Sequence, residues 1–153
     1  MEIEKRLEDL GMRLPEAPQP VGAYLPAQRS GPFLFISGQL PIAEGKICRG
    51  RVGQDLSLEE GQSACRLCAL NALAQAKAYL GDLEKITRVV KIVGYLRCSE
   101  GFADHAQVIN GASELLVQIL GEKGRHARAV LGVASLPLDA AVELEVTLEV
   151  EGA

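Results

Sequence analysis

The stretch VELEVTLEV at residues 142–150 alternates strictly between apolar and polar side chains. Valine and leucine take every second position, and glutamate or threonine takes the positions between. A period of two is typical of a β-strand, whose successive side chains point to opposite faces of a sheet. We therefore predict a strand with one face in a hydrophobic core and the other in water or at an interface.

Three further segments predict strands. Residues 126–134 also alternate, with one face formed by Ala127, Ala129, Leu131 and Val133 and the other by His126, Arg128, Val130 and Gly132. Residues 86–97, ITRVVKIVGYLR, are dense in β-branched side chains, which favours a buried strand. Residues 33–40, FLFISGQL, favour a strand up to Ser37, where Gly38 permits a bulge or a close backbone approach.

Helical patterns separate these strands. Ser57 and Glu60 form a capping box before an Ala- and Leu-rich run over 58–80 that stops at Gly81. A second helix is predicted to include Phe102 on its apolar face and to stop at Gly121, with Asn110 and Gly111 expected to interrupt its middle.

The order of elements predicts the fold class. A short amphipathic segment at 2–10 predicts an accessory N-terminal helix within residues 1–13. The remaining order is strand, helix, strand, helix, strand, strand, which predicts an α+β sandwich with helices on one face of a mixed sheet. At this length we expect one domain spanning residues 1–153.

Residues 14–32 contain most of the seven prolines and predict an extended arm without regular structure. Val21, Tyr24 and Leu25 give this arm apolar surface to bury, so we expect it to be ordered against the rest of the chain.

Composition excludes several classes of protein. Apolar residues make up 48% of the 153, too many for a disordered chain. The 16 basic and 20 acidic residues give a net charge of −4, which disfavours binding to a nucleic-acid backbone. The charged N-terminus does not resemble a secretory signal, and no run is apolar enough to span a membrane, so we expect a cytoplasmic protein without a membrane partner.

The pair Cys65-x-x-Cys68 lies about two turns inside the helix predicted over 58–80. That position lacks the helix N-terminus that would lower a thiol pKa, so packing is favoured over a redox or metal role. His105 and His126 lack the spacing of a zinc site, and we expect no metal.

Two charged strand residues remain as candidates for chemistry. The guanidinium of Arg128 could grip a planar carboxylate with two parallel hydrogen bonds, although a surface ion pair is the simpler interpretation. Glu143 shares its strand face with other polar residues, so a solvated charge is the simpler interpretation there.

Three segments carry a resemblance to a known family. They are GAY at 22–24, FISGQLP at 35–41 and HARAVLGVASLPLDAAVELEV at 126–146. Over about residues 21–150 the chain resembles the RidA family, also called YjgF or L-PSP. The resemblance implies a bacterial chorismate-mutase-like fold in a homotrimer, with the sheets forming an inner barrel, the helices outside and a ligand cleft between each pair of subunits.

The same resemblance implies a function. Arg128 would bind the carboxylate of a reactive 2-imino or enamino acid, and Glu143 would hold the water that attacks the imine carbon. The product would be a 2-oxo acid with release of ammonia, and no cofactor is required. Matching positions of the cleft lining are Tyr24, Ser37 and Gly38, with Asn110 as a looser match.

One departure from the family pattern leaves alternatives open. Val130 stands where deaminases of the family commonly have a cysteine, two residues after Arg128, which indicates a divergent branch. A non-catalytic trimer that binds a small carboxylate for regulation is therefore the second hypothesis. An endoribonuclease or translation inhibitor is the third, and the acidic composition argues against it.

Overall fold

The computed structural model describes residues 2–152, so the first and last residues of the expected 1–153 domain lie outside it. Five strands form one mixed sheet in the order β1-β2-β7-β5-β6, and β3 and β4 form a separate hairpin. The strands are β1 (Ala27–Ser30), β2 (Phe33–Gln39), β3 (Ile42–Ala43), β4 (Lys46–Ile47), β5 (Ile86–Arg97), β6 (Ala127–Val133) and β7 (Val142–Val150). The α-helices are α1 (Glu2–Asp9), α2 (Leu58–Leu80) and α3 (His105–Leu120), and short 3-10 turns cover Leu83–Lys85, Gly121–Gly124 and Pro137–Asp139.

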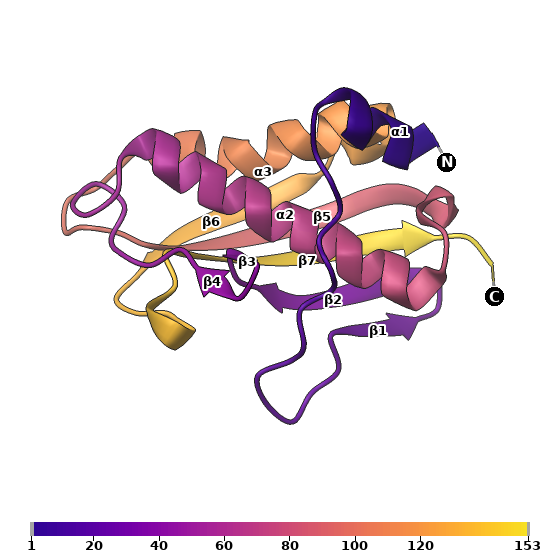
Figure 1. The fold of residues 1–153 in the computed structure, drawn as a ribbon, viewed down its shortest axis with the longest axis horizontal. Coiled ribbons are helices and arrows are strands. Elements are labelled where there is room, and N and C mark those ends of the chain that lie inside the picture. The colour runs from indigo at the N-terminus through magenta and orange to yellow at the C-terminus, as the bar shows by residue number, and fades with distance from the viewer. Residues whose placement is uncertain (1, 153) are drawn as a thin grey trace.

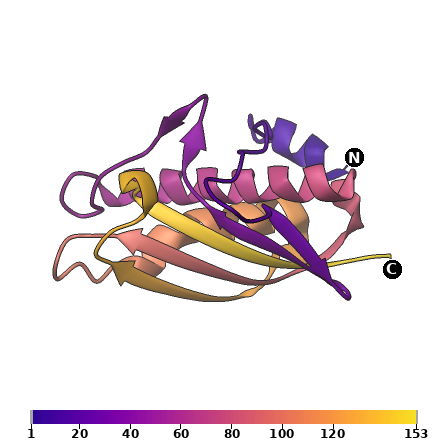
Figure 2. The same ribbon diagram turned by 90° about the horizontal axis from the view of Figure 1, so that it is seen from below.

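The helices and the sheet form two layers. Figure 1 shows α2 and α3 side by side over the sheet, with α1 next to the end of α3. Seen from below in Figure 2, the strands form a twisted layer along one side of α2. The predicted α+β architecture, with helices on one face of a mixed sheet, is confirmed.

β7 lies in the middle of the sheet, antiparallel to both β2 and β5. Its five apolar side chains are all buried, as the alternation predicts, and the polar side chains between them are not. β6 pairs in parallel with β5, so it needs the crossover that α3 provides. β6 lies at one edge of the sheet, and β1 lies at the other.

The boundaries of α2 are those that the sequence predicts. The Ser57 hydroxyl accepts a hydrogen bond from the Glu60 amide (3.1 Å), and the Glu60 carboxylate accepts one from the Ser57 amide (3.0 Å). At the other end Gly81 adopts a φ of 81°, a left-handed conformation that glycine enters without a steric penalty.

Two expectations about the chain before α2 are wrong. Part of the proline-rich arm is regular, because residues 27–30 pair with β2 as β1. The segment Ala27–Ser30 contains no proline, so its amides are available for pairing at the sheet edge. The hairpin β3–β4 was not predicted, because strands of two residues are too short to show a period.

α3 runs without a break through Asn110 and Gly111, contrary to the predicted interruption. Gly111 is buried where α3 crosses α2, and a Cβ atom there would overlap with the carbonyl oxygen of Gln62. The glycine therefore permits close contact between two helices, and the helix tolerates it because tertiary packing outweighs local propensity.

Replacing Gly111 with alanine should destabilise the protein, although the same change at an exposed helical site stabilises by about 1 kcal/mol. Overpacking against a backbone typically costs about 1–3 kcal/mol, so the net loss of stability is up to about 2 kcal/mol. We expect the melting temperature to fall by up to about 8 °C. Gln118→Gly, on the exposed face of α3, measures the effect of a glycine on helix propensity without any overpacking. A melting temperature of Gly111→Ala above that of the wild type would contradict the packing argument.

The cysteines of α2 belong to the core. Cys65 and Cys68 are fully buried, and burial raises the pKa of Cys65 to about 12 and that of Cys68 well above its ordinary value. Both thiols are thus protonated at neutral pH and unsuited to redox or metal chemistry.

Of the helices in residues 2–152, none is both long and apolar enough to cross a membrane.

The sheet face opposite the helices remains exposed in the single chain. Phe33, Phe35 and Leu131 project from it with exposed fractions of 37%, 47% and 49%. Alternation places Phe33 and Phe35 opposite the buried side chains of β2, and Leu131 opposite the half-buried side chains of β6. An open apolar sheet face of this kind is typical of a surface that another protein surface covers.

Candidate functional site

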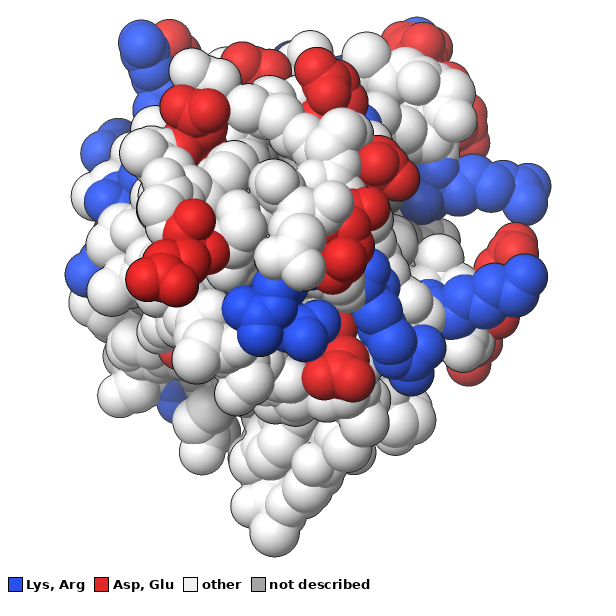
Figure 3. Space-filling model, turned by 90° about the vertical axis from the view of Figure 1, so that its left-hand side faces the viewer, with Lys and Arg blue, Asp and Glu red and all other residues white. Residues whose placement is uncertain are grey.

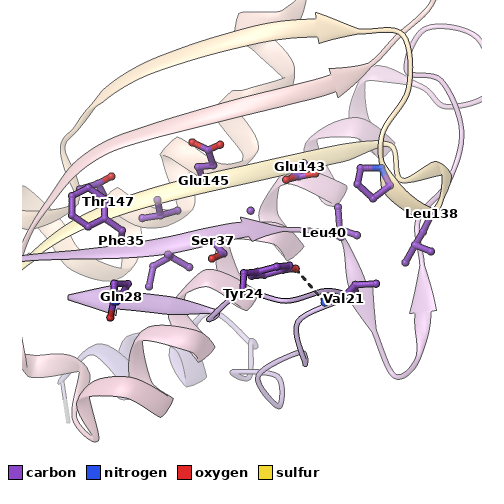
Figure 4. Close-up of a pocket in the computed structure, with 14 residues that line it drawn as sticks. Val21, Tyr24, Gln28, Phe35, Ser37, Leu40, Leu138, Glu143, Glu145 and Thr147 are labelled. Carbon is purple, nitrogen blue, oxygen red and sulfur yellow. Dashed lines mark hydrogen bonds between the residues drawn. The ribbon is translucent and has the colours of Figure 1, made fainter. Parts of the chain in front are cut away.

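A cleft of about 560 Å³ opens beside the exposed face of β2 and β7 (Figure 4). Its walls come from the arm before β1, from both strands and from the turn before β7. The polar side chains and the tyrosine that line it are Tyr24, Gln28, Ser37, Glu143, Glu145 and Thr147. The apolar lining includes Val21, Phe35, Leu40 and Leu138.

Hydrogen bonds hold the arm in place beside β2. The Ser37 hydroxyl donates to the carbonyl of Leu25 (2.6 Å), and the Ser37 amide donates to that of Pro26 (2.9 Å). From α2, the buried Gln75 side chain donates to the carbonyl of Pro18 (2.6 Å). The expectation that the arm buries Val21, Tyr24 and Leu25 is wrong for the single chain, because all three side chains are exposed. Hydrogen bonds hold the arm instead, and they place Tyr24 on the cleft wall.

Tyr24 faces the cleft with about half of its side chain exposed. Its hydroxyl oxygen accepts a hydrogen bond from the amide of Val21 (3.2 Å), which closes a small loop in the arm. The phenol O–H has no other partner in the described part of the chain and is free to donate to a ligand.

Glu143 lies directly over Gly38. A Cβ atom at residue 38 would overlap with the Glu143 carboxylate, so the strand needs glycine at this position. Burial, and secondarily the charge of Glu145, raise the pKa of Glu143 above its usual range. A half-buried carboxylate with a raised pKa is a better proton acceptor than one in bulk water.

Glu145 is two residues further along β7 and lines the same cleft. It accepts a hydrogen bond from the Tyr95 hydroxyl (3.0 Å), and this bond is the main reason why the pKa of Tyr95 is raised. The cleft thus contains two carboxylates, one of them tied to a tyrosine and the other, Glu143, available to a ligand.

Arg128 lies on the other face of the sheet, where edge strand β6 meets α3. Its Nη1 donates to the Asn110 side-chain oxygen (2.6 Å) and to the Ser113 hydroxyl (3.1 Å). Its Nη2 donates to the Ala106 carbonyl (3.2 Å). Of the five N–H groups of a guanidinium, those left without a partner among residues 2–152 are on the adjacent atoms Nε and Nη2.

The sequence-predicted site residues therefore fall into two groups. Tyr24, Ser37, Gly38 and Glu143 come together at the cleft. Arg128 and Asn110 come together at the β6–α3 edge, and neither lines the cleft of the same chain.

The cleft wall that the described chain supplies contains no lysine or arginine. Its two charged side chains, Glu143 and Glu145, are both negative, so one chain alone offers no cation for a ligand carboxylate.

Some residues of these groups were not identified from the sequence. Glu145 lines the cleft because the period of two puts it on the same face as Glu143, a signal that was available. Ser113 contacts Arg128 because it lies three residues after Asn110 on the same side of α3. Leu138 joins the cleft through a turn with a φ of 59°, which no period predicts.

Within residues 2–152, no three His, Cys, Asp or Glu side chains are grouped so that they could hold a metal ion. Figure 3 shows one end of the molecule, where basic and acidic side chains are interspersed and no continuous basic area forms. Neither feature adds a candidate site to the two groups above.

Comparisons with known proteins agree with this fold. The family model described as "YjgF/chorismate_mutase-like, putative endoribonuclease" matches residues 4–149. The chain belongs to this family, which is the one that its GAY, SGQLP and HAR segments resemble, and the chorismate-mutase-like fold is confirmed.

Individual relatives span nearly the whole chain. Protein TCP17 of Trypanosoma cruzi is 42% identical over 149 residues, covering 96% of this chain and 93% of that protein. A protein of unknown function from Agrobacterium tumefaciens has a crystal structure with a TM-score of 0.92 and 47% identity, covering 99% of this chain and 93% of the other. RidA from an Antarctic Psychrobacter gives a TM-score of 0.64 at 28% identity, covering 88% and 94%.

Proposed function

We propose that this protein hydrolyses reactive 2-imino acids, and their enamine tautomers, to 2-oxo acids and ammonia. The observation that supports this most directly is Glu143, a carboxylate with a raised pKa that faces an open cleft of mostly apolar walls. Family membership together with the RidA relative makes this chemistry the first to consider.

The reaction needs a carboxylate site, a held water and a proton acceptor. Water adds through oxygen to the carbon of the protonated imine while Glu143 takes one proton from the water, which gives a neutral tetrahedral carbinolamine. Glu143 then returns this proton to the amine nitrogen. The C–N bond breaks and ammonia leaves, while the hydroxyl group loses its proton to the Glu143 carboxylate and the carbon–oxygen bond becomes a carbonyl. Because a protonated imine is already electrophilic, orientation and proton transfer account for the catalysis.

The carboxylate site is Arg128 of a neighbouring copy. Arg128 keeps its Nε–H and one Nη2–H without a partner among residues 2–152, and N–H groups on these two adjacent atoms can pair with both oxygens of a carboxylate. Since the cleft of one chain has no cation, the arginine has to come from a second chain. The exposed face with Phe33, Phe35 and Leu131 supplies a surface for that assembly, and a closed homotrimer forms three such clefts.

Binding of a 2-oxo acid tests the carboxylate site. Arg128→Ala should weaken binding of pyruvate or 2-oxobutanoate at least about tenfold, because it removes two charge-assisted hydrogen bonds. Calorimetric titration measures the affinity, and Arg125→Ala, an exposed arginine three residues before it, is the matched control. Equal affinity of Arg128→Ala and the wild type would refute this site.

The same experiment separates the alternatives. Binding that depends on Arg128, without faster decay of a freshly generated 2-imino acid, would replace the hydrolase with a carboxylate-binding regulator. Cleavage of RNA that survives purification and depends on Glu143 would support an endoribonuclease instead. The interspersed charges of Figure 3 and the net charge of −4 offer little to a phosphate backbone.

A further inference from the structure

Behind Arg128 a chain of hydrogen bonds leads away from the proposed ligand position. Arg128 Nη1 contacts the Ser113 hydroxyl at 3.1 Å, and that hydroxyl contacts His126 Nε2 at 2.8 Å. His126 Nδ1 in turn lies 2.6 Å from the carbonyl oxygen of Gly124. Three elements are linked in this way: β6 with the residue before it, α3, and the 3-10 turn between them.

When the His126 ring is neutral, the two ends of this hydrogen-bond chain determine the donor and acceptor roles along it. The Gly124 carbonyl can only accept, so Nδ1 of His126 carries a proton. In the neutral ring Nε2 is then an acceptor and takes the Ser113 hydroxyl proton. The Ser113 oxygen thereby directs a lone pair toward Arg128, whose Nη1 can only donate.

The consequence for Arg128 is a fixed orientation. Asn110 and Ser113 together take both protons of Nη1, and Ala106 takes one of Nη2. These contacts hold the guanidinium on its Nη1 side. The N–H groups on Nε and Nη2 that remain without a partner then keep a fixed orientation. Binding then costs less side-chain entropy than it would for a freely rotating arginine.

We propose that Ser113 and His126 are positioning residues for Arg128: the imidazole orients the Ser113 hydroxyl, and the hydroxyl orients the guanidinium for a carboxylate ligand. The identity of that ligand rests on the proposed function, whereas the hydrogen-bond chain does not. Neither residue touches the ligand, so both act through Arg128.

Spectroscopy of the ligand-free protein tests whether the hydrogen-bond chain from Arg128 to Gly124 exists. The sequence has two histidines, so His105 serves as an internal reference in ¹⁵N spectra. In the neutral ring of His126 we expect the proton on Nδ1. Ser113→Ala should move the His126 Nε2 and Arg128 Nε–H signals and leave His105 unchanged. A His126 ring that carries its proton on Nε2, or an Arg128 signal that does not respond to Ser113→Ala, overturns the proposal.

Ligand affinity tests the consequence. Ser113→Ala should raise the Kd for pyruvate about three- to tenfold, the range expected for the loss of one hydrogen bond to a charged group. Ser113→Thr keeps the hydroxyl and should restore the affinity to within about twofold. Alanine is a good helix former, so Ser113→Ala should not weaken α3. Wild-type affinity in Ser113→Ala, when Arg128→Ala has lost binding, overturns the proposal.

The kinetic pattern distinguishes positioning from chemistry. In an active wild-type enzyme, Ser113→Ala should raise KM with kcat within about twofold, since the variant weakens binding and leaves Glu143 in place. A large fall in kcat at constant KM would overturn the positioning role. If the wild type binds no 2-oxo acid, the proposed function fails, and the ligand-free spectra still decide whether Ser113 and His126 orient Arg128.

Discussion

Glu143→Gln should lower the rate of 2-imino acid hydrolysis by about 10²–10⁴-fold, the range typical of lost general acid–base assistance. Glutamine keeps the shape over Gly38 but cannot take a proton from water. The rate is measured as the decay of a freshly generated 2-imino acid in buffer without nucleophilic amines. Affinity for a 2-oxo acid should change little, because Arg128 supplies that contact.

Glu145→Gln is the matched control for this prediction. It lies on the same face of β7 and lines the same cleft, but its carboxylate is tied to Tyr95. We expect its rate at neutral pH to stay within about tenfold of the wild type. Equal losses in Glu143→Gln and Glu145→Gln would contradict the assignment of the base to Glu143.

The raised pKa of Glu143 gives the wild type and Glu145→Gln different pH dependences. A base works when deprotonated, so kcat/KM of the wild type should fall as the pH drops through this raised pKa. Because the charge of Glu145 contributes to the shift, Glu145→Gln should move that limb to lower pH. Burial, the larger cause, keeps the pKa raised in the variant.

Above neutral pH, Glu143→Gln should be more stable than the wild type although it is less active. A carboxyl whose pKa is raised by folding contributes stability below its unfolded pKa of about 4.3, and that contribution is lost as the pH rises through the folded value. Glu143→Gln has no charge to bury. It should therefore melt at a higher temperature than the wild type at pH 8, and the difference should vanish below about pH 4.

At limiting substrate, mixing two impaired variants should restore activity if the protein forms the proposed homotrimer. Arg128→Ala lacks the carboxylate contact and Glu143→Gln lacks the base, so a trimer made of either variant alone would have no complete cleft. In randomly mixed trimers, a cleft that takes Arg128 from one chain and Glu143 from the next is complete in about a quarter of cases. We expect about a quarter of wild-type activity after the two are unfolded and refolded together.

The control for mixing is the double variant Arg128→Ala, Glu143→Gln refolded with the wild type. It supplies neither group, so only clefts between two wild-type chains work, again about a quarter. Refolded with either single variant it should give no recovery. If the two single variants fail to complement each other while the wild type refolds normally, Arg128 and Glu143 do not form a shared site.

Much of the sheet could be predicted because its strand segments are long enough to show an alternation of apolar and polar residues. Nine residues of strict alternation identify β7, and the capping box and Gly81 delimit α2. The pattern failed at Gly111, since a glycine that permits helix contact looks in sequence like one that breaks a helix. It also failed at β1, where neighbouring prolines concealed four residues that can pair.

The site was only partly predictable for a related reason. Alternation separates Arg128 from Leu131 and Glu143 from Val142, but it does not show which sheet face the helices cover. The structure puts Arg128 under α3 and Glu143 on the opposite, open face. The link from Ser113 to His126 joins a helix to the chain before a strand, and single-element periods contain no such information.

The two groups of site residues depend on different kinds of contact. Ser37, Gln75 and Gly38 shape the cleft within one chain, so its acidic wall forms as soon as that chain folds. Under the proposed function, the cation arrives only when chains associate. Dilution below the dissociation constant of the assembly would then leave a folded but inactive protein. Turnover per chain would then rise steeply with abundance, and the cell would control the activity by how much of the protein it makes.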